Sequence, residues 1–197
     1  YVITGWTESF GAGGTDVYVI TTDADGNETL FDAQTPRVFG GPQDDYGRSM
    51  QLTSGNGYVI AGQMCLPDDS GCHVYLLKID ERGNEIWSLI LNAGATGDAT
   101  EAWSVNETSD GGFIMTGEAS SRGNSDILVV KTDASGDKEW QRQLGGEGED
   151  VGNYICETAD GDFIVAGALD KDRALIKLGP TGKTVWEKTY PSAGRDA

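Results

Sequence analysis

The 197-residue chain is strongly acidic, with 32 Asp and Glu residues against 14 Lys and Arg residues and a formal net charge of −18. Such a charge repels phosphate backbones and anionic lipid surfaces, so we expect no nucleic-acid partner. The chain has no apolar run of the length that spans a bilayer, about 18 residues, so we expect no membrane insertion. Its 29 glycines against 5 prolines indicate many tight turns.

One short motif recurs four times along the chain. An aromatic residue is followed by apolar residues and a glycine at positions 1–5, 58–62, 113–117 and 163–167. The four glycines fall 57, 55 and 50 positions apart. Self-similarity at this spacing indicates a repeat architecture.

A second apolar strand and a glycine turn follow each copy of this motif. The strands are expected at 17–20, 74–77, 127–130 and 174–176, and the turn glycines are Gly26, Gly83, Gly136 and Gly182. Four residues after each glycine stands Leu30, Trp87, Trp140 or Trp186. The constant register predicts that Trp87, Trp140 and Trp186 have a structural role in packing one repeat against the next.

Each repeat is completed by a glycine-rich acidic loop and a further alternating strand. This strand ends in an Asn-Gly or Asp-Gly hairpin signal in several copies. Helical periodicity is absent, so the chain is predicted to be all-β, with four-stranded antiparallel repeats.

A four-stranded sheet with two apolar faces is buried when such sheets stack around an axis, so the repeats are predicted to be β-propeller blades. We expect a single propeller region over 1–197 with about four blades. The approximate repeats are 1–45, which lacks its first strand, 46–99, 100–150 and 151–197. An arc of a larger propeller, an incomplete ring and the pairing of two chains remain alternatives.

At these motifs the sequence resembles a family of secreted bacterial and archaeal β-propeller repeats. Their blades combine an aromatic-apolar-apolar-small-Gly strand with an Asp-x-x-Gly-x-x-x-Trp turn, which positions 80–87 and 133–140 match. The last copy has Gly179 in place of the aspartate, and the first has Leu30 in place of the tryptophan. The turn is also similar to the tryptophan-docking turn of quinoprotein-type propellers, which include members without the cofactor. The resemblance therefore implies the fold, and no cofactor is expected.

The cysteines point to an oxidising compartment. Cys65 and Cys72 bracket a polar loop between two expected strands, where a local disulfide is predicted, the alternative being two free thiols. Cys156 lies in an alternating strand and is expected to be a small core residue.

Two acidic features are candidate cation sites. Asp23, Asp25 and Asn27 alternate around Gly26 as in the start of a calcium loop, although a plain hairpin turn explains the same residues. Acidic residues also recur before the first strand of each complete repeat, as Asp44 and Asp45, Asp98 and Glu101, and Glu149 and Asp150. A rim of acids can bind a cation or a sugar, but aspartates also accept hydrogen bonds from loop amides.

Few other residues point to chemistry. The single histidine, His73, is expected at the surface or on an edge, and it leaves no basis for a multi-histidine metal site or a Ser-His-Asp triad. Trp6 and Trp103 stand outside the tryptophan register and are the aromatic residues most open to another role.

These observations predict an extracellular or cell-surface module without enzymatic activity, used for binding, adhesion or surface assembly. We expect a protein or carbohydrate ligand in loops 7–15, 31–45, 63–72 or 92–100. One alternative is a fragment of a polysaccharide-degrading or quinone-dependent enzyme whose catalytic groups lie outside this chain. Another is a self-assembling filament or coat subunit that associates through open blade edges.

Overall fold

The computed structural model describes residues 1–29, 31, 36–67, 71–91, 99–121 and 124–191. All of its regular elements are β-strands, as the sequence predicted, and they form four antiparallel sheets. Within these described residues there is no helix, and so none that is long and apolar enough to cross a membrane.

Each sheet follows the chain in order, and we call the sheets blades 1 to 4. Blade 1 contains β1 (Val2–Thr7), β2 (Asp16–Thr22), β3 (Glu28–Thr29) and β4 (Arg37–Phe39). Blade 2 contains β5 (Asp45–Thr53), β6 (Gly57–Cys65), β7 (Cys72–Asp80) and β8 (Glu85–Leu91). Blade 3 contains β9 (Ala99–Glu107), β10 (Phe113–Ser121), β11 (Asn124–Thr132) and β12 (Lys138–Leu144). Blade 4 contains β13 (Val151–Glu157), β14 (Phe163–Leu169), β15 (Asp172–Leu178) and β16 (Thr184–Tyr190).

Blade 1 differs from the others in how its strands pair. Its β1 corresponds to the second strand of the other blades, and both β3 and β4 pair with β2, at opposite ends of that strand. Blades 2, 3 and 4 are complete four-stranded meanders.

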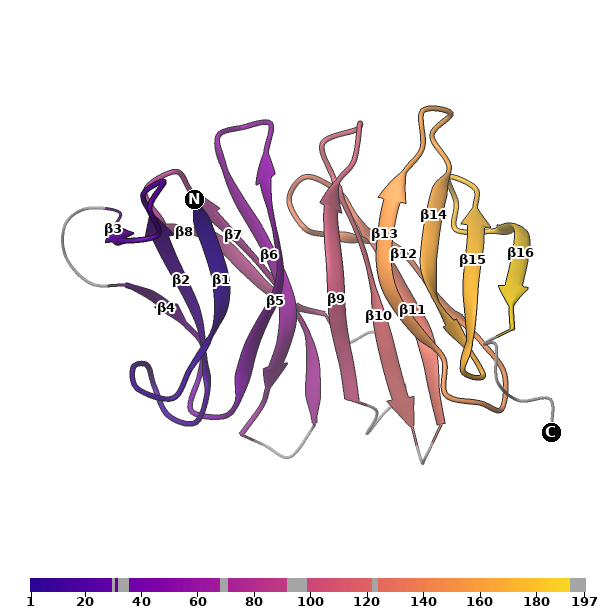
Figure 1. Ribbon diagram of the computed structural model, residues 1–197, viewed down its shortest axis with the longest axis horizontal. Helices are drawn as coiled ribbons and strands as arrows, with labels where there is room; N and C mark the ends of the chain where they lie inside the picture. Colours follow the sequence, from indigo (N-terminus) through magenta and orange to yellow (C-terminus); the bar gives the residue numbers. More distant parts are fainter. Residues whose placement is uncertain (30, 32–35, 68–70, 92–98, 122–123, 192–197) are drawn as a thin grey trace.

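The blades stand side by side along the molecule (Figure 1). The first strands β5, β9 and β13 contact one another in that order, and β1 contacts β5. We call β5, β9 and β13 the inner strands, because each forms the edge at which its blade meets its neighbours. The arrangement is an all-β, propeller-like arc.

The core lies between the blades and consists of three layers. Val17 and Val19 of blade 1 meet Ile60 and Leu77 of blade 2 in the first layer. Alternate residues of the same strands point the other way, so Val59 and Leu76 face blade 3 instead. The same alternation builds the layer between blades 3 and 4. Every internal blade is therefore buried on both faces.

The recurring tryptophans close these layers on the outside. The Trp87 ring lies 5.9 Å from the Phe113 ring of the next blade, and Trp140 lies 5.9 Å from Phe163. Trp140 also donates a hydrogen bond from Nε1 to the carbonyl of Pro180 at 3.1 Å. Trp186, by contrast, lies on the last blade and is 36% exposed. Leu30 lies outside the described residues.

Polar contacts join neighbouring blades at the inner strands. Glu107 accepts hydrogen bonds from the amide and the hydroxyl of Ser54, at 2.7 and 3.0 Å. Glu157 makes the same pair of bonds with Ser109, at 2.6 and 2.8 Å. A carboxylate at the end of one inner strand thus holds the hairpin turn of the preceding blade.

The predicted disulfide is present between Cys65 and Cys72. These residues form the last pair of the β6–β7 ladder, so the bond ties the two strands together where they separate. Cys156 is a free cysteine on β13 and is partly buried.

Candidate functional site

A β-bulge occurs at the same position in each of the three complete blades. The register between the first and second strands shifts at Arg48 in β5, at Trp103 in β9 and at Asn153 in β13. Bulges bend a strand and redirect a side chain, and they are frequent at functional sites. The same backbone device therefore presents a different side chain in each blade.

The bulge residues of blades 2 and 3 meet in a stack. The Arg48 guanidinium lies 4.7 Å from the centroid of the Tyr46 ring and 4.9 Å from that of Trp103. Its Nε also donates to Oε1 of Glu101 at 2.6 Å. A planar cation between two aromatic faces, fixed by a carboxylate, is held in one orientation.

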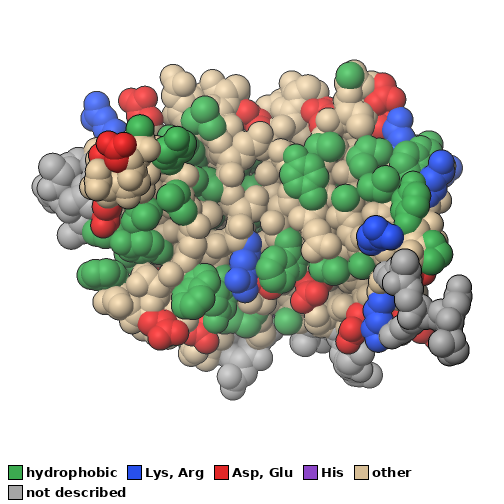
Figure 2. Space-filling view, viewed as in Figure 1, with side chains coloured by type: hydrophobic (Ala, Val, Ile, Leu, Met, Phe, Trp, Pro, Cys, Tyr) green, Lys and Arg blue, Asp and Glu red, His purple; other side chains and the backbone are tan. Residues whose placement is uncertain are grey.

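Trp6 extends this row to blade 1. Its ring meets Tyr46 edge to face, with 6.0 Å between the centroids, and 51% of the residue stays exposed. Hydrophobic side chains flank a basic one at the boundary between β5 and β9 in Figure 2. We call Trp6, Tyr46, Arg48, Glu101 and Trp103 the inner-strand site.

The electrostatics of this site are acidic on the side of blade 3. Glu118 of β10 pairs in register with Glu101. Burial raises the pKa of the Glu118 carboxyl, and the neighbouring Glu101 and Glu149 raise it further. Arg48 offsets one of these charges, so the site combines aromatic faces with donors and acceptors of hydrogen bonds.

The residues of the calcium candidate form a hairpin turn. Oδ1 of Asp23 accepts hydrogen bonds from the amides of Asp25 and Asn27, both at 2.9 Å, and Oδ2 accepts from the Asn27 side chain at 3.0 Å. Asp80 makes the same contacts with Asn84 in blade 2. These bonds explain the aspartate as a turn-forming residue, and calcium binding at this turn stays a prediction.

The recurring rim acids include two buried aspartates in equivalent places. Asp45 accepts hydrogen bonds from the amides of Gly41 and Cys65 at 2.6 and 3.0 Å. Asp150 accepts from the amides of Gly146 and Asp170 at 2.8 and 2.7 Å. Each carboxylate joins the glycine-rich loop to the next hairpin of its own blade, which is a structural task.

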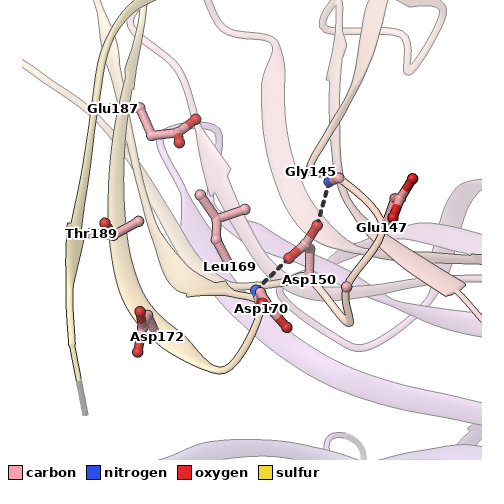
Figure 3. A pocket seen from close by; sticks show the side chains of 10 residues that line it. Gly145, Glu147, Asp150, Leu169, Asp170, Asp172, Glu187 and Thr189 are labelled. Carbon is pink, nitrogen blue, oxygen red and sulfur yellow. Dashed lines mark hydrogen bonds between the residues drawn. The ribbon is translucent and has the colours of Figure 1, made fainter. Parts of the chain in front are cut away.

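A cavity of about 560 Å³ lies beside Asp150 (Figure 3). Acidic side chains from the glycine-rich loop and from β15 and β16 line it, among them Glu147, Asp172 and Glu187. Asp150 is engaged in the loop contacts described above, and the described residues contain no cluster of three or more metal-binding side chains.

His73 was expected at the surface or on an edge, and this prediction was wrong. It is 4% exposed and is the second residue of β7, which lies inside its sheet. The reason is its position: it occupies the place that Asp16, only 1% exposed, has in blade 1.

Sequence reasoning singled out Trp6 and Trp103 but missed Tyr46 and Arg48, and it treated Glu101 as a rim acid. The signal was available in the repeat itself. Arg48, Trp103 and Asn153 occupy one position of the repeat, and their side chains differ in chemistry. Of the expected loops, most of 92–100 lies outside the described residues.

Comparisons with known proteins give the fold alone. No protein-family model and no curated protein matches this chain. A solved structure of a protein of unknown function from Bacteroides caccae is similar, with a TM-score of 0.51 and 11% identity, over 96% of this chain and 58% of that one.

Two further structures match less well. One is described as the eukaryotic initiation factor, with a TM-score of 0.47 and 10% identity over 96% of this chain and 52% of that one. The other is BBS1N in complex with ARL6DN, with a TM-score of 0.38 and 10% identity over 95% and 66%. The chain thus spans between about half and two thirds of these structures.

Proposed function

We propose that this chain is an extracellular, non-enzymatic binding module of the propeller type, and that it binds a carbohydrate at the inner-strand site. The observation that carries the proposal is the bulge shared by β5 and β9. It brings Arg48 and Trp103 together beside an exposed Trp6. At this position the three complete blades carry Arg48, Trp103 and Asn153, so the side chain that the bulge presents differs from blade to blade.

The chemistry of the site supports a sugar ligand. Sugar rings present apolar C–H faces that pack on aromatic rings, and the Trp6 ring is half exposed. Their hydroxyls accept hydrogen bonds from a guanidinium and donate them to carboxylates, here Arg48 and Glu101. Because Arg48 is already held between two rings, little side-chain freedom is lost when a ligand binds.

Two observations support an extracellular setting. The disulfide Cys65–Cys72 is of the kind that persists in oxidising compartments. The resemblance of the blade motifs to secreted bacterial and archaeal propeller repeats agrees with it. The high negative charge keeps such a surface well hydrated.

The test is a screen of immobilised glycans, followed by calorimetric titration of the best ligand. We expect Trp6→Ala to weaken binding about fivefold to thirtyfold, since a stacked ring contributes on the order of 1–2 kcal/mol. Arg48→Lys keeps the charge but loses the planar stack, so it should also weaken binding. Tyr190→Ala, a similarly exposed aromatic on β16 outside the inner-strand site, is the matched control and should bind normally when all the proteins are titrated as monomers.

The outcomes separate the candidate functions. Loss of binding in Trp6→Ala and Arg48→Lys, but not in Tyr190→Ala, supports the proposal. Absence of binding across the screen, or equal affinities in all variants, contradicts it. Release of soluble sugars from a polysaccharide, or absorbance of a bound quinone, favours the enzyme alternative instead.

A further inference from the structure

The turn between the third and fourth strands is a docking point at every junction between blades. Its glycine has a positive φ in all four blades, from 74° to 88°. In blades 2, 3 and 4 side chains from the outer edge of the preceding blade cover this glycine closely. A Cβ built there would lie 2.1–3.2 Å from the covering atoms, which belong to Phe31 and Arg37 at Gly83, Leu89 and Trp87 at Gly136, and Trp140 and Arg142 at Gly182.

The junction between blades 3 and 4 shows how the cover is fixed. Arg142 donates hydrogen bonds to the carbonyls of Gly182 and Thr181, at 3.1 and 2.6 Å. Arg37 likewise donates to the carbonyl of Arg82 at 3.2 Å, between blades 1 and 2. An aromatic side chain over the glycine and a cation on the turn carbonyls are therefore shared by both junctions.

Among the described residues, one turn has no covering side chains and one pair of covering side chains has no turn beneath it, and the two lie at opposite ends of the molecule (Figure 1). Around Gly26 of blade 1 no atom of the described residues lies within 4 Å of a built Cβ. On blade 4, Trp186 and Lys188 occupy the places of Trp140 and Arg142. The Lys188 ammonium lies 5.7 Å from the Trp186 ring, and both side chains are exposed to solvent.

The two outermost sheet faces carry apolar side chains at equivalent positions of the repeat. We call the face of blade 1 that points away from blade 2 the leading face, and the face of blade 4 that points away from blade 3 the trailing face. The trailing face of blade 4 contains Ile164, Leu175, Trp186 and Tyr190, with a groove of about 450 Å³ beside Leu175 and Tyr190. The leading face of blade 1 contains Tyr1, Ile3, Tyr18 and Ile20, which correspond to the buried or partly buried Tyr58, Ile60, Tyr75 and Leu77 of blade 2. Tyr1 is 78% exposed and holds the position at which Phe113 and Phe163 receive a tryptophan. Hydrophobic side chains are visible at both ends in Figure 2.

The charges at the two ends are opposite, although the whole chain is acidic. The Gly26 turn carries Asp23 and Asp25, both exposed. The trailing face carries Lys188 and Arg173, also exposed. Each end therefore complements the other and repels a copy of itself.

We propose that the trailing face of one copy binds the leading face of a second copy, so that Trp186 and Lys188 cover the partner copy's Gly26 turn. The contact joins two different surfaces, so it continues head to tail until it closes into a ring or extends as a filament. Two copies bring together twice the four sheets of one chain, a number found in closed propellers.

Charge reversal tests the pairing directly. Lys188→Glu places a carboxylate opposite Asp25, and Asp25→Arg places a cation opposite Lys188, so each single variant should lose self-association. Blade 2 already has Arg82 at the position of Asp25, so the turn accommodates an arginine. The double variant restores an attractive pair and should regain the assembly. Lys138→Glu, the same charge change on the covered outer strand β12, is the matched control.

The measurement is the molar mass by light scattering over a concentration series at low ionic strength, with circular dichroism to verify folding. A mass of two or more chains that is lost in both single variants and regained in the double variant supports the proposal. A wild-type chain that stays monomeric at every concentration overturns it. So does an assembly that the single variants leave intact, since its contact would lie elsewhere.

Discussion

A lysine in the third strand of each complete blade lies beside the hairpin that joins the first two strands. Lys131 donates to Oδ2 of Asp110 at 2.9 Å, and Lys177 donates to Asp160 at 2.9 Å. In blade 2 the corresponding lysine is Lys78, but Gly55 stands where the other two blades have the aspartate. Lys78 donates a hydrogen bond to the Thr53 hydroxyl instead. Burial lowers the pKa of Lys78, against a smaller opposite effect of Glu107.

Gly55→Asp is expected to stabilise the protein by about 1 kcal/mol, because it supplies the missing carboxylate and restricts the unfolded chain. No atom of the residues that the structure describes lies within 4 Å of a Cβ built on Gly55, so the side chain has room. Urea unfolding measures the change. Gly55→Ala is the control, since it restricts the unfolded chain equally but offers Lys78 no partner. Equal stabilities of the two variants would contradict the pairing.

The carboxylate of Asp110 in blade 3 makes the free energy of unfolding depend on pH. Partial burial raises the pKa of Asp110, but hydrogen bonds from Thr108, Lys131 and Gly112 outweigh it and lower the pKa to about 2. The unfolded chain takes up this proton first, at about pH 4, so the stabilisation is present above that pH and is lost as the pH falls toward 2. Asp110→Asn should therefore flatten the loss of stability on acidification. Urea unfolding at neutral and acidic pH tests this, and parallel profiles for the two proteins would contradict it.

The hairpin of β6 and β7 depends on its disulfide. The bond closes a loop with a sequence separation of 7 residues, for which about 2 kcal/mol of stabilisation is expected. Replacing Cys65 and Cys72 together by serine should lower the free energy of unfolding by that amount. Cys156→Ser is the control that leaves the bond intact. A double variant as stable as this control would show that the bond stabilises nothing.

Trp140 and Trp186 occupy equivalent positions, so replacing each of them shows how much of the stabilisation comes from packing between blades. Trp140 covers the turn of blade 4, whereas no further blade lies beyond Trp186 among the described residues. Trp140→Ala should destabilise the monomer by about 3 kcal/mol, and Trp186→Ala by less than about 1 kcal/mol. Urea unfolding followed by circular dichroism, at a concentration where the chain is monomeric, measures both. Similar losses would mean that the tryptophan acts within its own blade.

The strands were largely predictable because each carries an alternating pattern that recurs at a fixed place in the repeat. The disulfide was predictable because its cysteines flank one hairpin loop. The inner-strand site was only half predictable: Trp6 and Trp103 stood out, but a bulge leaves no local pattern in a single strand. Arg48 becomes visible only when three strands are superimposed on their registers.

At the scale of the whole molecule, buried layers join four similar sheets whose inner strands touch. Side chains link these strands directly: Ser49 accepts a hydrogen bond from the amide of Val105 at 3.2 Å, and Ser104 from the amide of Ile155 at 3.4 Å. Since inner strands are in contact and blades fan outward from them in a propeller, the outer turns must be farther apart than the inner ones.

Distances between pairs of spin labels test this arc most directly. Labels at positions 55 and 160 report the separation of blades 2 and 4 at their inner hairpins, and labels at 82 and 181 report it at their outer turns. The experiment uses cysteine substitutions in a Cys156→Ser chain with the disulfide intact. The account predicts a clearly shorter distance for the inner pair, whereas equal distances would mean that the sheets stack in a straight line, and the propeller-like arc would be wrong.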